Sequence, residues 1–421
     1  MSGAASAPAD LRAAVRAAAA ALIGEAQAPL EVTFERPPRA DFGDYSTNAA
    51  LLLAPRLGQP PREVAQRLGE ALKEALGEQL RRFEVAGPGF LNLFVGDGWL
   101  SAALAGILLA GESFGAGGRG SPERVLVEFV SANPTGPMHV GHARNAAYGD
   151  ALARLLAFDG AQVTREFYVN DAGSQVRKLG ESVLALARGE EVAQDGYRGE
   201  YVKPLAERVR RQLESAAGGP VRAGGSSPQG GVDAEGAVEA GDAAEAGAIA
   251  VGVLLEDMQR SLAAFGVVFD SWSYESMLHA GEPSAVAHTL ALLEQQGRTY
   301  YSDGALWLRT TDYGDDKDRV LVRSSGEHTY FASDIAYHQD KRERGFQRQI
   351  DVWGADHHGY VARMKAAYEA LGGDPQHLEM LIMQLVHLVR RGERAQMSKR
   401  AGEFVTLEDL LEEIGVDAAR W

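Results

Sequence analysis

The 421-residue sequence contains no cysteine, which excludes disulfide bonds and thiolate metal sites. It also lacks the run of roughly 18 apolar residues that a membrane-spanning helix needs, and its first 26 residues predict an Ala-rich helix rather than a signal peptide. Basic residues are in the minority, and the net charge of −16 argues against a surface that binds nucleic acid everywhere. We therefore expect a cytoplasmic protein without a membrane anchor, whose contacts with nucleic acid are local.

The residues that are present predict a globular protein of two or three domains, with 45% hydrophobic and 24% charged residues. Residues 1–112 predict a small α+β domain with helices at 10–26 and near 61–77. Between them RPPRADFGDYSTNAALLLA is rich in loop formers, and RRFEVAGPGFLNLFV predicts a strand, a Pro-Gly turn and a strand. The glycine-rich stretch GESFGAGGRGSPE then predicts a linker.

From Arg124 the pattern changes to that of a parallel α/β domain. RVLVEFV predicts a buried strand, residues 140–157 a helix and AQVTREFYV the next strand, which makes a βαβ unit. Helices are expected at about 245–265 and 282–297, and YYSDGALWLRT alternates like a strand. TYFASDIAYH and RQIDVWGADHHGY each predict a short strand that enters a helix, and LEMLIMQLVHLV and TLEDLLEEIG predict helices.

Residues 215–247 have a different composition, because they contain almost no large apolar side chains. Such a segment cannot bury enough surface to offset the entropy lost on ordering. We interpret it as a disordered insertion that carries no chemistry.

The first stretch whose residues indicate a chemical role is SANPTGPMHVGHAR. His139 and His142 lie three residues apart where a loop enters a helix, so both side chains can face one ligand beside free backbone N–H groups. Such a helix start favours a phosphate chain. Gly141 between them has no Cβ and allows a base or a phosphate to approach the backbone. Taken alone, two histidines at this spacing are as compatible with a capped helix or a chance metal pair.

The second stretch is AQMSKRAG, far downstream. A glycine-flanked loop that carries Lys399 and Arg400 can stabilise the charge that develops when pyrophosphate leaves ATP. A basic loop by itself is usually a solvated surface. The pair of stretches is much more specific than either one.

HVGH followed far downstream by MSK resembles the signature pair of the class I aminoacyl-tRNA synthetases. VEFVSANPTGPMHVGHARN resembles the active-site stretch of the arginyl-tRNA synthetases, and FGDYSTNAALLLA and GPGFLNLFV resemble the amino-terminal domain of that family. The sequence departs from the family pattern at Gln396, where the family often has a lysine, and it ends where the family continues into an anticodon-binding domain.

The resemblance implies a Rossmann-like parallel-sheet catalytic domain over residues 120–400, preceded by the small α+β domain. A connective insertion would occupy about 180–325 and contain the disordered segment. Residues 401–421 would begin the linker to the missing anticodon-binding domain.

The resemblance also implies the roles of individual residues. Catalysis falls to His139, His142 and Lys399, and ATP binding to these three together with Gly141, Met397 and Ser398. A planar, permanently charged guanidinium needs carboxylates in fork geometry and neutral polar partners. The expected arginine-binding residues are Glu128, Ser131, Asn133, Glu275, Tyr330, Asp334 and Asp356.

Three further expectations concern other ligands. Phe90 and Asn92 in GPGFLN are candidates for contact with a tRNA loop, although Phe90 is equally compatible with a hairpin core. We expect no metal site at His357 and His358, because neighbouring residues on a helix do not face one ligand and no third ligand is evident. Mg²⁺ is expected only as part of the ATP substrate, with no tightly bound cofactor.

The implied function is ATP-dependent ligation of L-arginine to tRNA(Arg) through an arginyl-adenylate, by a monomer. Two alternatives stay open from the residues alone. One is a tRNA-independent ligase or nucleotidyltransferase on the same fold. The other is an RNA-binding or regulatory paralogue without turnover, against which the intact His139, His142 and Lys399 argue.

Overall fold

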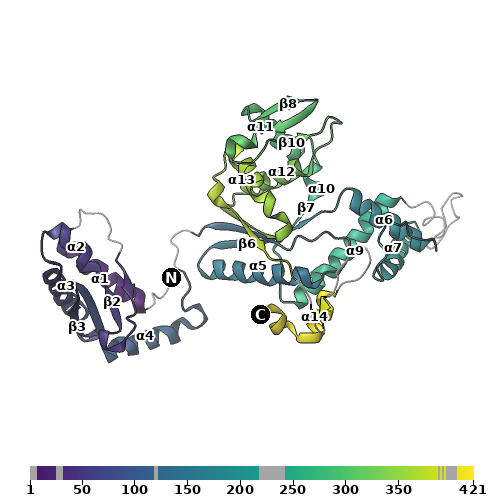
Figure 1. Cartoon of the computed structure of the whole chain (residues 1–421). Coiled ribbons are helices and arrows are strands. Elements are labelled where there is room, and N and C mark those ends of the chain that lie inside the picture. Colours follow the sequence, from purple (N-terminus) through teal and green to yellow (C-terminus); the bar gives the residue numbers. More distant parts are fainter. Residues whose placement is uncertain are drawn as a thin grey trace, which may run out of the picture. The chain divides into compact units, whose positions relative to one another are not determined.

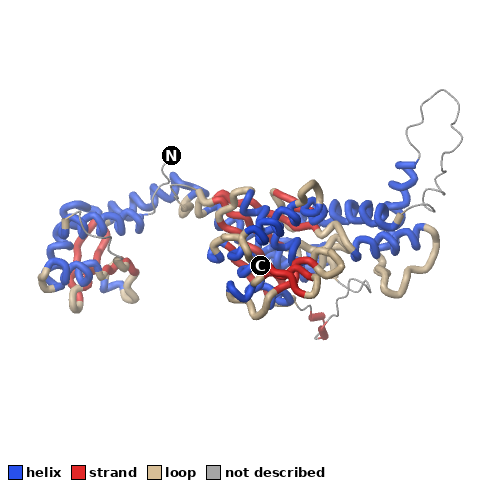
Figure 2. Tube along the Cα trace, turned by 90° about the horizontal axis from the view of Figure 1, so that it is seen from above, coloured by secondary structure: helices blue, strands red, loops and turns tan. Residues whose placement is uncertain are grey.

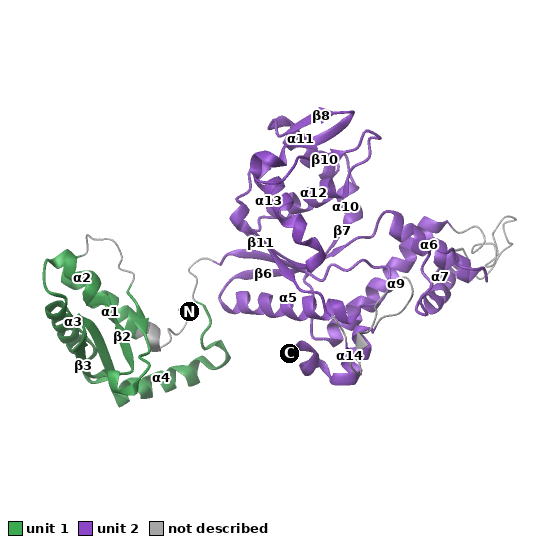
Figure 3. Ribbon diagram, viewed as in Figure 1, with its two compact units in different colours: residues 1–120 green, residues 121–421 purple. Residues whose placement is uncertain are grey.

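The computed structural model describes residues 7–24, 32–117, 122–217, 242–386, 389–390, 393–394 and 405–421. The chain divides into two compact units, residues 1–120 and 121–421, which are coloured separately in Figure 3. The division falls inside the predicted linker GESFGAGGRGSPE. None of the described helices is long and apolar enough to cross a membrane.

Unit 1 is a four-stranded antiparallel sheet, in the order β1-β2-β4-β3, packed against helices (Figure 1). The predicted helices and the strand–turn–strand are confirmed. Three elements were missed. RPPRADFGDYSTNAALLLA contains β2 and the first turns of α2, and α4 is apolar on all sides, so it shows no helical periodicity in sequence. The bounds are α1 Ala7–Ile23, β1 Phe34–Glu35, β2 Tyr45–Thr47, α2 Ala49–Leu57, α3 Pro61–Leu76, β3 Leu80–Ala86, β4 Phe90–Val95 and α4 Asp97–Ala110.

Unit 2 is built on a five-stranded parallel sheet in the order β12-β11-β5-β6-β7. The predicted βαβ unit is confirmed as β5, α5 and β6. From β5 the chain continues outward to one side and later returns to the other, so the topological switch point lies between β5 and β11. The bounds are β5 Arg124–Phe129, α5 Val140–Phe158, β6 Gln162–Val169, β7 Ser271–Tyr274, β11 Arg348–Gly354 and β12 Leu378–Met383.

The two faces of this sheet meet different helices. Side chains alternate along a strand, and Val125, Val127 and Phe129 of β5 pack in the core shared with α5. Glu128 therefore points to the opposite face, where it meets α12 (Tyr330–Glu343). Figure 1 shows α5 on one side of the sheet and α12 with α13 (Val361–Ala370) on the other.

A helical subdomain follows β6 and consists of α6 Ser174–Ala187, α7 Val202–Ala217 and α9 Ala243–Ala264, visible as blue tubes in Figure 2. The predicted disordered segment 215–247 was too wide at both ends, because residues 215–217 close α7 and 243–247 open α9. Asp242 caps α9, and Gly247 packs so closely on α6 that a Cβ would lie 2.6 Å from the Val176 carbonyl. Residues 218–241 lie outside the described residues.

A small antiparallel sheet, β10-β9-β8, is inserted between β7 and β11. YYSDGALWLRT is a hairpin rather than one strand, because Asp303 and Gly304 both have positive φ (50° and 75°) and form a two-residue turn. The bounds are β8 Thr299–Ser302, β9 Ala305–Leu308 and β10 Arg319–Val322, accompanied by α10 Glu275–His279 and α11 Ala285–Gln295.

Two predicted elements were wrong. TYFASDIAYH is not a strand end but the first turns of α12, which Thr329 caps through its hydroxyl. LEMLIM is not a helix but β12, whose backbone pairs in parallel with β11 along its whole length. In both cases packing against the sheet overrides the local preference. Tyr330 and Asp334 consequently reach the site from a helix.

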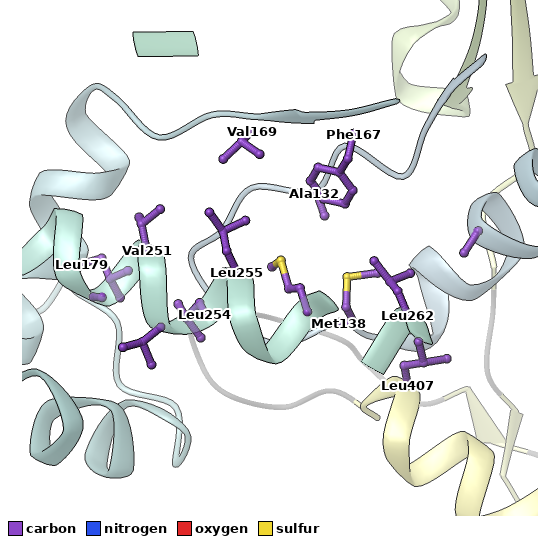
Figure 4. Packing of buried hydrophobic residues seen from close by; sticks show 14 of the residues in the cluster. Ala132, Met138, Phe167, Val169, Leu179, Val251, Leu254, Leu255, Leu262 and Leu407 are labelled. Carbon is purple, nitrogen blue, oxygen red and sulfur yellow. The ribbon is translucent and has the colours of Figure 1, made fainter. Parts of the chain in front are cut away.

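The end of the chain is also different from the expected linker at 401–421. Residues 405–421 belong to unit 2, where α14 Leu407–Ile414 and α15 Val416–Arg420 pack against α5. Leu407 is fully buried beside Leu262 and Met138 (Figure 4). Arg420 ties the last turn down through Asp150 of α5 and the Phe265 carbonyl.

Candidate active site

Two cavities open at the carboxyl ends of β5 and β11, at the switch point of the sheet. The larger encloses about 650 Å³ and is lined by the loop after β5 and the start of α5. The smaller encloses about 380 Å³ between β5, β6, α12 and the turn after β11. Val130, Ser131, Asn145, Gly354 and His357 line both, so the two cavities adjoin. Ligands in open parallel sheets collect at such a point.

His139 and His142 form a tight turn at the start of α5. The Gly141 N–H donates to Nδ1 of His139 over 3.1 Å, and the His139 N–H donates to Nδ1 of His142 over 3.3 Å. The two rings stack with centroids 3.7 Å apart. A Cβ at Gly141 would lie 2.8 Å from the His139 ring. Its missing side chain therefore makes room for the stacked histidines.

The described chain that follows residue 404 binds directly to this turn. The Val140 N–H donates to the Val405 carbonyl over 3.1 Å, the Leu407 N–H donates to the Met138 carbonyl over 2.9 Å, and Thr406 pairs with His139. The predicted ATP-binding residues Met397, Ser398 and Lys399 lie outside the described residues. So does Gln396.

The loop after β5 is strained where it turns into the cavities. Val130 and Ser131 both have positive φ, 69° and 39°, which side chains with a Cβ rarely adopt. Tertiary hydrogen bonds hold this turn: Ser131 Oγ donates to Glu128 over 2.8 Å and accepts from the Tyr168 N–H over 3.1 Å. Ser131 thus lies between the two cavities, as its place in both linings shows.

Asp334 lines the smaller cavity, whereas Glu275 is not among the lining residues of either cavity but bonds the side chain of the lining residue Tyr168. Burial raises the pKa of Glu275 to about 7, and the carboxylates Asp334 and Asp171 contribute to the rise. Burial also raises the pKa of Asp334, although the hydroxyl that Tyr360 donates over 2.6 Å opposes the rise. Within the described ranges, neither carboxylate has an arginine or lysine nitrogen within 4.0 Å. A cationic ligand would stabilise the charged form of both carboxylates and so lower both pKa values.

Glu128 lines the same cavity but already has a cationic partner. Its Oε2 accepts from Nζ of Lys341 over 2.7 Å, and the same Nζ donates to Asp351 over 2.8 Å. Burial raises the pKa of Glu128, and Lys341 partly offsets that rise. Glu166 on the neighbouring strand is likewise paired, since Arg344 holds it with two hydrogen bonds of 2.6 and 2.8 Å.

The other predicted arginine-binding residues lie around the cavity mouths. Asn133 and Asp356 are exposed and line the larger cavity. Tyr330 lines the smaller one, but 64% of it is exposed, so it lies at the rim. His357 borders both cavities, whereas His358 borders neither. Within the described part of the chain, no group of three His, Cys, Asp or Glu side chains is arranged to hold a metal ion.

Two tyrosines and one lysine near the site do not stand out in the sequence. Tyr360 donates to Asp334, and the Tyr168 hydroxyl bonds Glu275. Lys341 has no exposed surface at all. Tyr360 ends the stretch GADHHGY, but nothing in that pattern indicates a bond to α12.

The candidate tRNA-contacting residues of unit 1 differ in exposure. Phe90 is the first residue of β4, and it is 40% exposed. Asn92 is only 5% exposed, and its amide oxygen accepts from the Ser46 hydroxyl over 2.8 Å. Asn92 therefore joins β4 to β2, and Phe90 is the one of the pair that offers a surface.

Two family models cover this chain. The arginyl tRNA synthetase N-terminal domain matches residues 9–95, and the catalytic domain of the class I (R) tRNA synthetases matches residues 104–194 and 249–420. The chain belongs to the arginyl-tRNA synthetase family. The second match runs through α14 and α15, which agrees with their packing in unit 2.

Solved structures of this family resemble the chain. A structure assigned as an arginyl-tRNA synthetase of Campylobacter jejuni is 35% identical with a TM-score of 0.65, covering 77% of this chain and 67% of its own. The Thermus thermophilus enzyme is 26% identical with a TM-score of 0.63, covering 97% and 73%. The Plasmodium falciparum enzyme, 15% identical with a TM-score of 0.57 over 89% and 64%, shares the fold.

Proposed function

We propose that this arginyl-tRNA synthetase family member ligates L-arginine to tRNA(Arg), with ATP as co-substrate and an arginyl-adenylate as intermediate. The observation that carries the proposal is the pair Asp334 and Glu275, one half-buried and one buried, which have no cationic partner among the described residues. The smaller cavity, which Asp334 lines, adjoins a second cavity at a helix start with two histidines. One cavity suits a cation and the other a phosphate chain.

Arginine would place its guanidinium in the smaller cavity, near Asp334 and Glu275. Tyr360 and Tyr168 fix these carboxylates by hydrogen bonds, so their geometry exists before the ligand enters. The α-amino and carboxylate end would then lie toward Ser131, Asn133 and Asp356, where the cavities adjoin.

ATP, as its Mg²⁺ complex, would occupy the larger cavity with its phosphates at the start of α5. The positive end of the helix dipole and the side chains of His139 and His142 favour the phosphates there. The arginine carboxylate attacks the α-phosphorus, the bond to the β-phosphate oxygen breaks, and pyrophosphate leaves. Lys399 would stabilise the charge on the departing group. Positioning and electrostatics supply most of the acceleration.

The second step would transfer the arginyl group to tRNA. A ribose hydroxyl of the terminal adenosine attacks the carbonyl of the adenylate, and AMP leaves. The exposed Phe90 ring of unit 1 is our candidate for stacking on a tRNA loop base.

Pyrophosphate exchange with each of the twenty amino acids, with and without tRNA(Arg), tests the proposal. We expect exchange with arginine at least about 10³-fold above lysine, because a compact ammonium leaves one of the buried carboxylates unsatisfied. Equal exchange with lysine would refute the assignment of the smaller cavity. Exchange with no amino acid, combined with tRNA binding, would favour the regulatory paralogue instead.

A further inference from the structure

Lys341 is the most deeply buried cation near the site. Its ammonium lies 2.7 Å from Glu128, 2.8 Å from Asp351 and 4.2 Å from the centre of the Tyr337 ring. The side chains of Lys341 and Asp351 have no exposed surface. Burying a lysine away from water costs folding free energy unless all of its partners are in place. The position of Lys341 therefore points to a specific function.

The hydrogen bonds of Lys341 form part of a continuous chain. On one side, the hydrogen-bond partner Glu128 lines the smaller cavity, as does Tyr337, whose ring the ammonium faces. On the other, the second oxygen of Asp351 bonds Nε2 of His338 over 2.7 Å, and Nδ1 of His338 bonds the backbone carbonyl of Asp334 over 2.7 Å. The chain thus begins and ends at two carboxylate residues of the cavity wall.

Glu128 is held from two directions. Ser131 Oγ donates to Oε1 over 2.8 Å, and Lys341 donates to Oε2 over 2.7 Å. Each carboxylate oxygen keeps a further lone pair that can accept from a ligand. The orientation of the carboxylate is therefore fixed, while both of its oxygens can still accept a hydrogen bond from a ligand.

We propose that Lys341 is a positioning residue for amino-acid recognition, which holds Glu128 ready at the cavity wall and joins it directly to α12, the helix that also carries Asp334. Asp351 and His338 brace the same helix from β11. The inference rests on the proposed function and adds a residue to it. Lys341 reaches no ligand itself, so its effect on arginine passes through Glu128. Its 213-residue separation from Glu128 in sequence hides this link.

Electrostatics gives this arrangement a measurable signature. Burial would lower the pKa of Lys341, but Asp351, Glu128 and Glu166 raise it above its usual value, so the ammonium stays charged. Burial raises the pKa of Glu128, and Lys341 is the largest influence against the rise. Without Lys341, Glu128 would take up a proton at a higher pH. The groups that face Glu128 are Tyr168 from β6, Tyr337, His338 and Lys341 from α12, and Asp351 from β11.

The test is a cycle of the variants Lys341→Met, Glu128→Gln and both together, with Lys317→Met on an exposed turn as the matched control. Calorimetry measures the Kd of L-arginine and of MgATP. We expect each single variant to bind arginine about 10- to 100-fold more weakly, the loss of one hydrogen bond to a charged group. The double variant should be no more than about threefold weaker than Glu128→Gln alone, since neighbours that act as a unit are not additive.

The pH profile separates positioning from a purely structural role. In Lys341→Met the arginine Kd should keep improving as the pH rises beyond the range in which the unchanged chain has levelled off, because Glu128 ionises at a higher pH there. In the double variant this extra dependence should disappear. MgATP binding should stay within about twofold of the unchanged chain throughout.

Three outcomes would overturn the inference. They are unchanged arginine binding in a folded Lys341→Met, a double variant whose loss is the product of the single losses, and a double variant that fails to fold. If Lys341→Met alone fails to fold, the test is the arginine Kd of the double variant compared with that of Glu128→Gln, and a difference of more than about threefold would contradict the inference. An unchanged chain that binds no arginine would instead refute the proposed function.

Discussion

We expect arginine binding to depend on pH because of the position of Glu275. In the empty protein its pKa is about 7, because the carboxylate is buried and lies near Asp334 and Asp171. A guanidinium in the cavity would stabilise the charged form and lower this pKa. Affinity is therefore full above pH 7 and is lost as the pH falls through that value.

The size of the effect follows from the ionised fraction. Between pH 8 and pH 6, a group with a pKa of about 7 goes from mostly ionised to mostly protonated, a change of about tenfold. The arginine Kd should rise about tenfold over that range. At pH 7 each arginine bound should release about half a proton.

Calorimetry at several pH values, in two buffers of different ionisation enthalpy, measures both quantities. Glu275→Gln should bind arginine more weakly but with a pH dependence of less than about threefold over the same range. The exposed acid Glu327 supplies the control, since Glu327→Gln should keep the full slope. A flat profile in the unchanged chain, or an equal slope in Glu275→Gln, would refute the reasoning.

Other substitutions test the remaining parts of the site. Asp334→Asn should weaken arginine binding by about 10²-fold with MgATP binding within about twofold, and a loss dominated by ATP would remove Asp334 from the amino-acid cavity. Gly141→Ala puts a Cβ 2.8 Å from the His139 ring and should raise the KM for ATP about 3- to 10-fold; an unchanged KM would mean that the ring moves aside freely. Lys399→Ala should slow pyrophosphate exchange about 10²–10³-fold at unchanged arginine binding, and an equal rate would make that loop an ordinary surface loop.

Local patterns predicted the first half of the catalytic unit well. The β-branched run of β5, the loop and the helix from Val140 all stand where the sequence placed them, because their periodicity and their packing agree. The position of His139 and His142 at a helix start follows from the same agreement. Their stacking, and the need for glycine at Gly141, depend on ring positions that no sequence pattern encodes.

Elements decided by distant partners were harder to predict. Leu378–Met383 is rich in Leu and Met, which favour helices, yet its backbone pairs with β11 and becomes the edge of the sheet. Asp334 was selected as a pocket residue through resemblance, but its place on α12 was missed. The buried partners Lys341 and Asp351 were also missed, since a lysine in a sequence predicts a solvated surface unless its partners are known.

The way the chain returns to the histidine turn bears on where the molecule can be cut. Residues 405–407 supply backbone partners for Met138 and Val140, and Arg420 joins Asp150 in the same helix. A fragment that stopped at residue 400, the domain limit suggested by sequence, would leave those groups of the turn without partners and uncover Leu262. The shortest piece worth expressing for crystallography or ligand screening therefore runs from about residue 121 through Trp421.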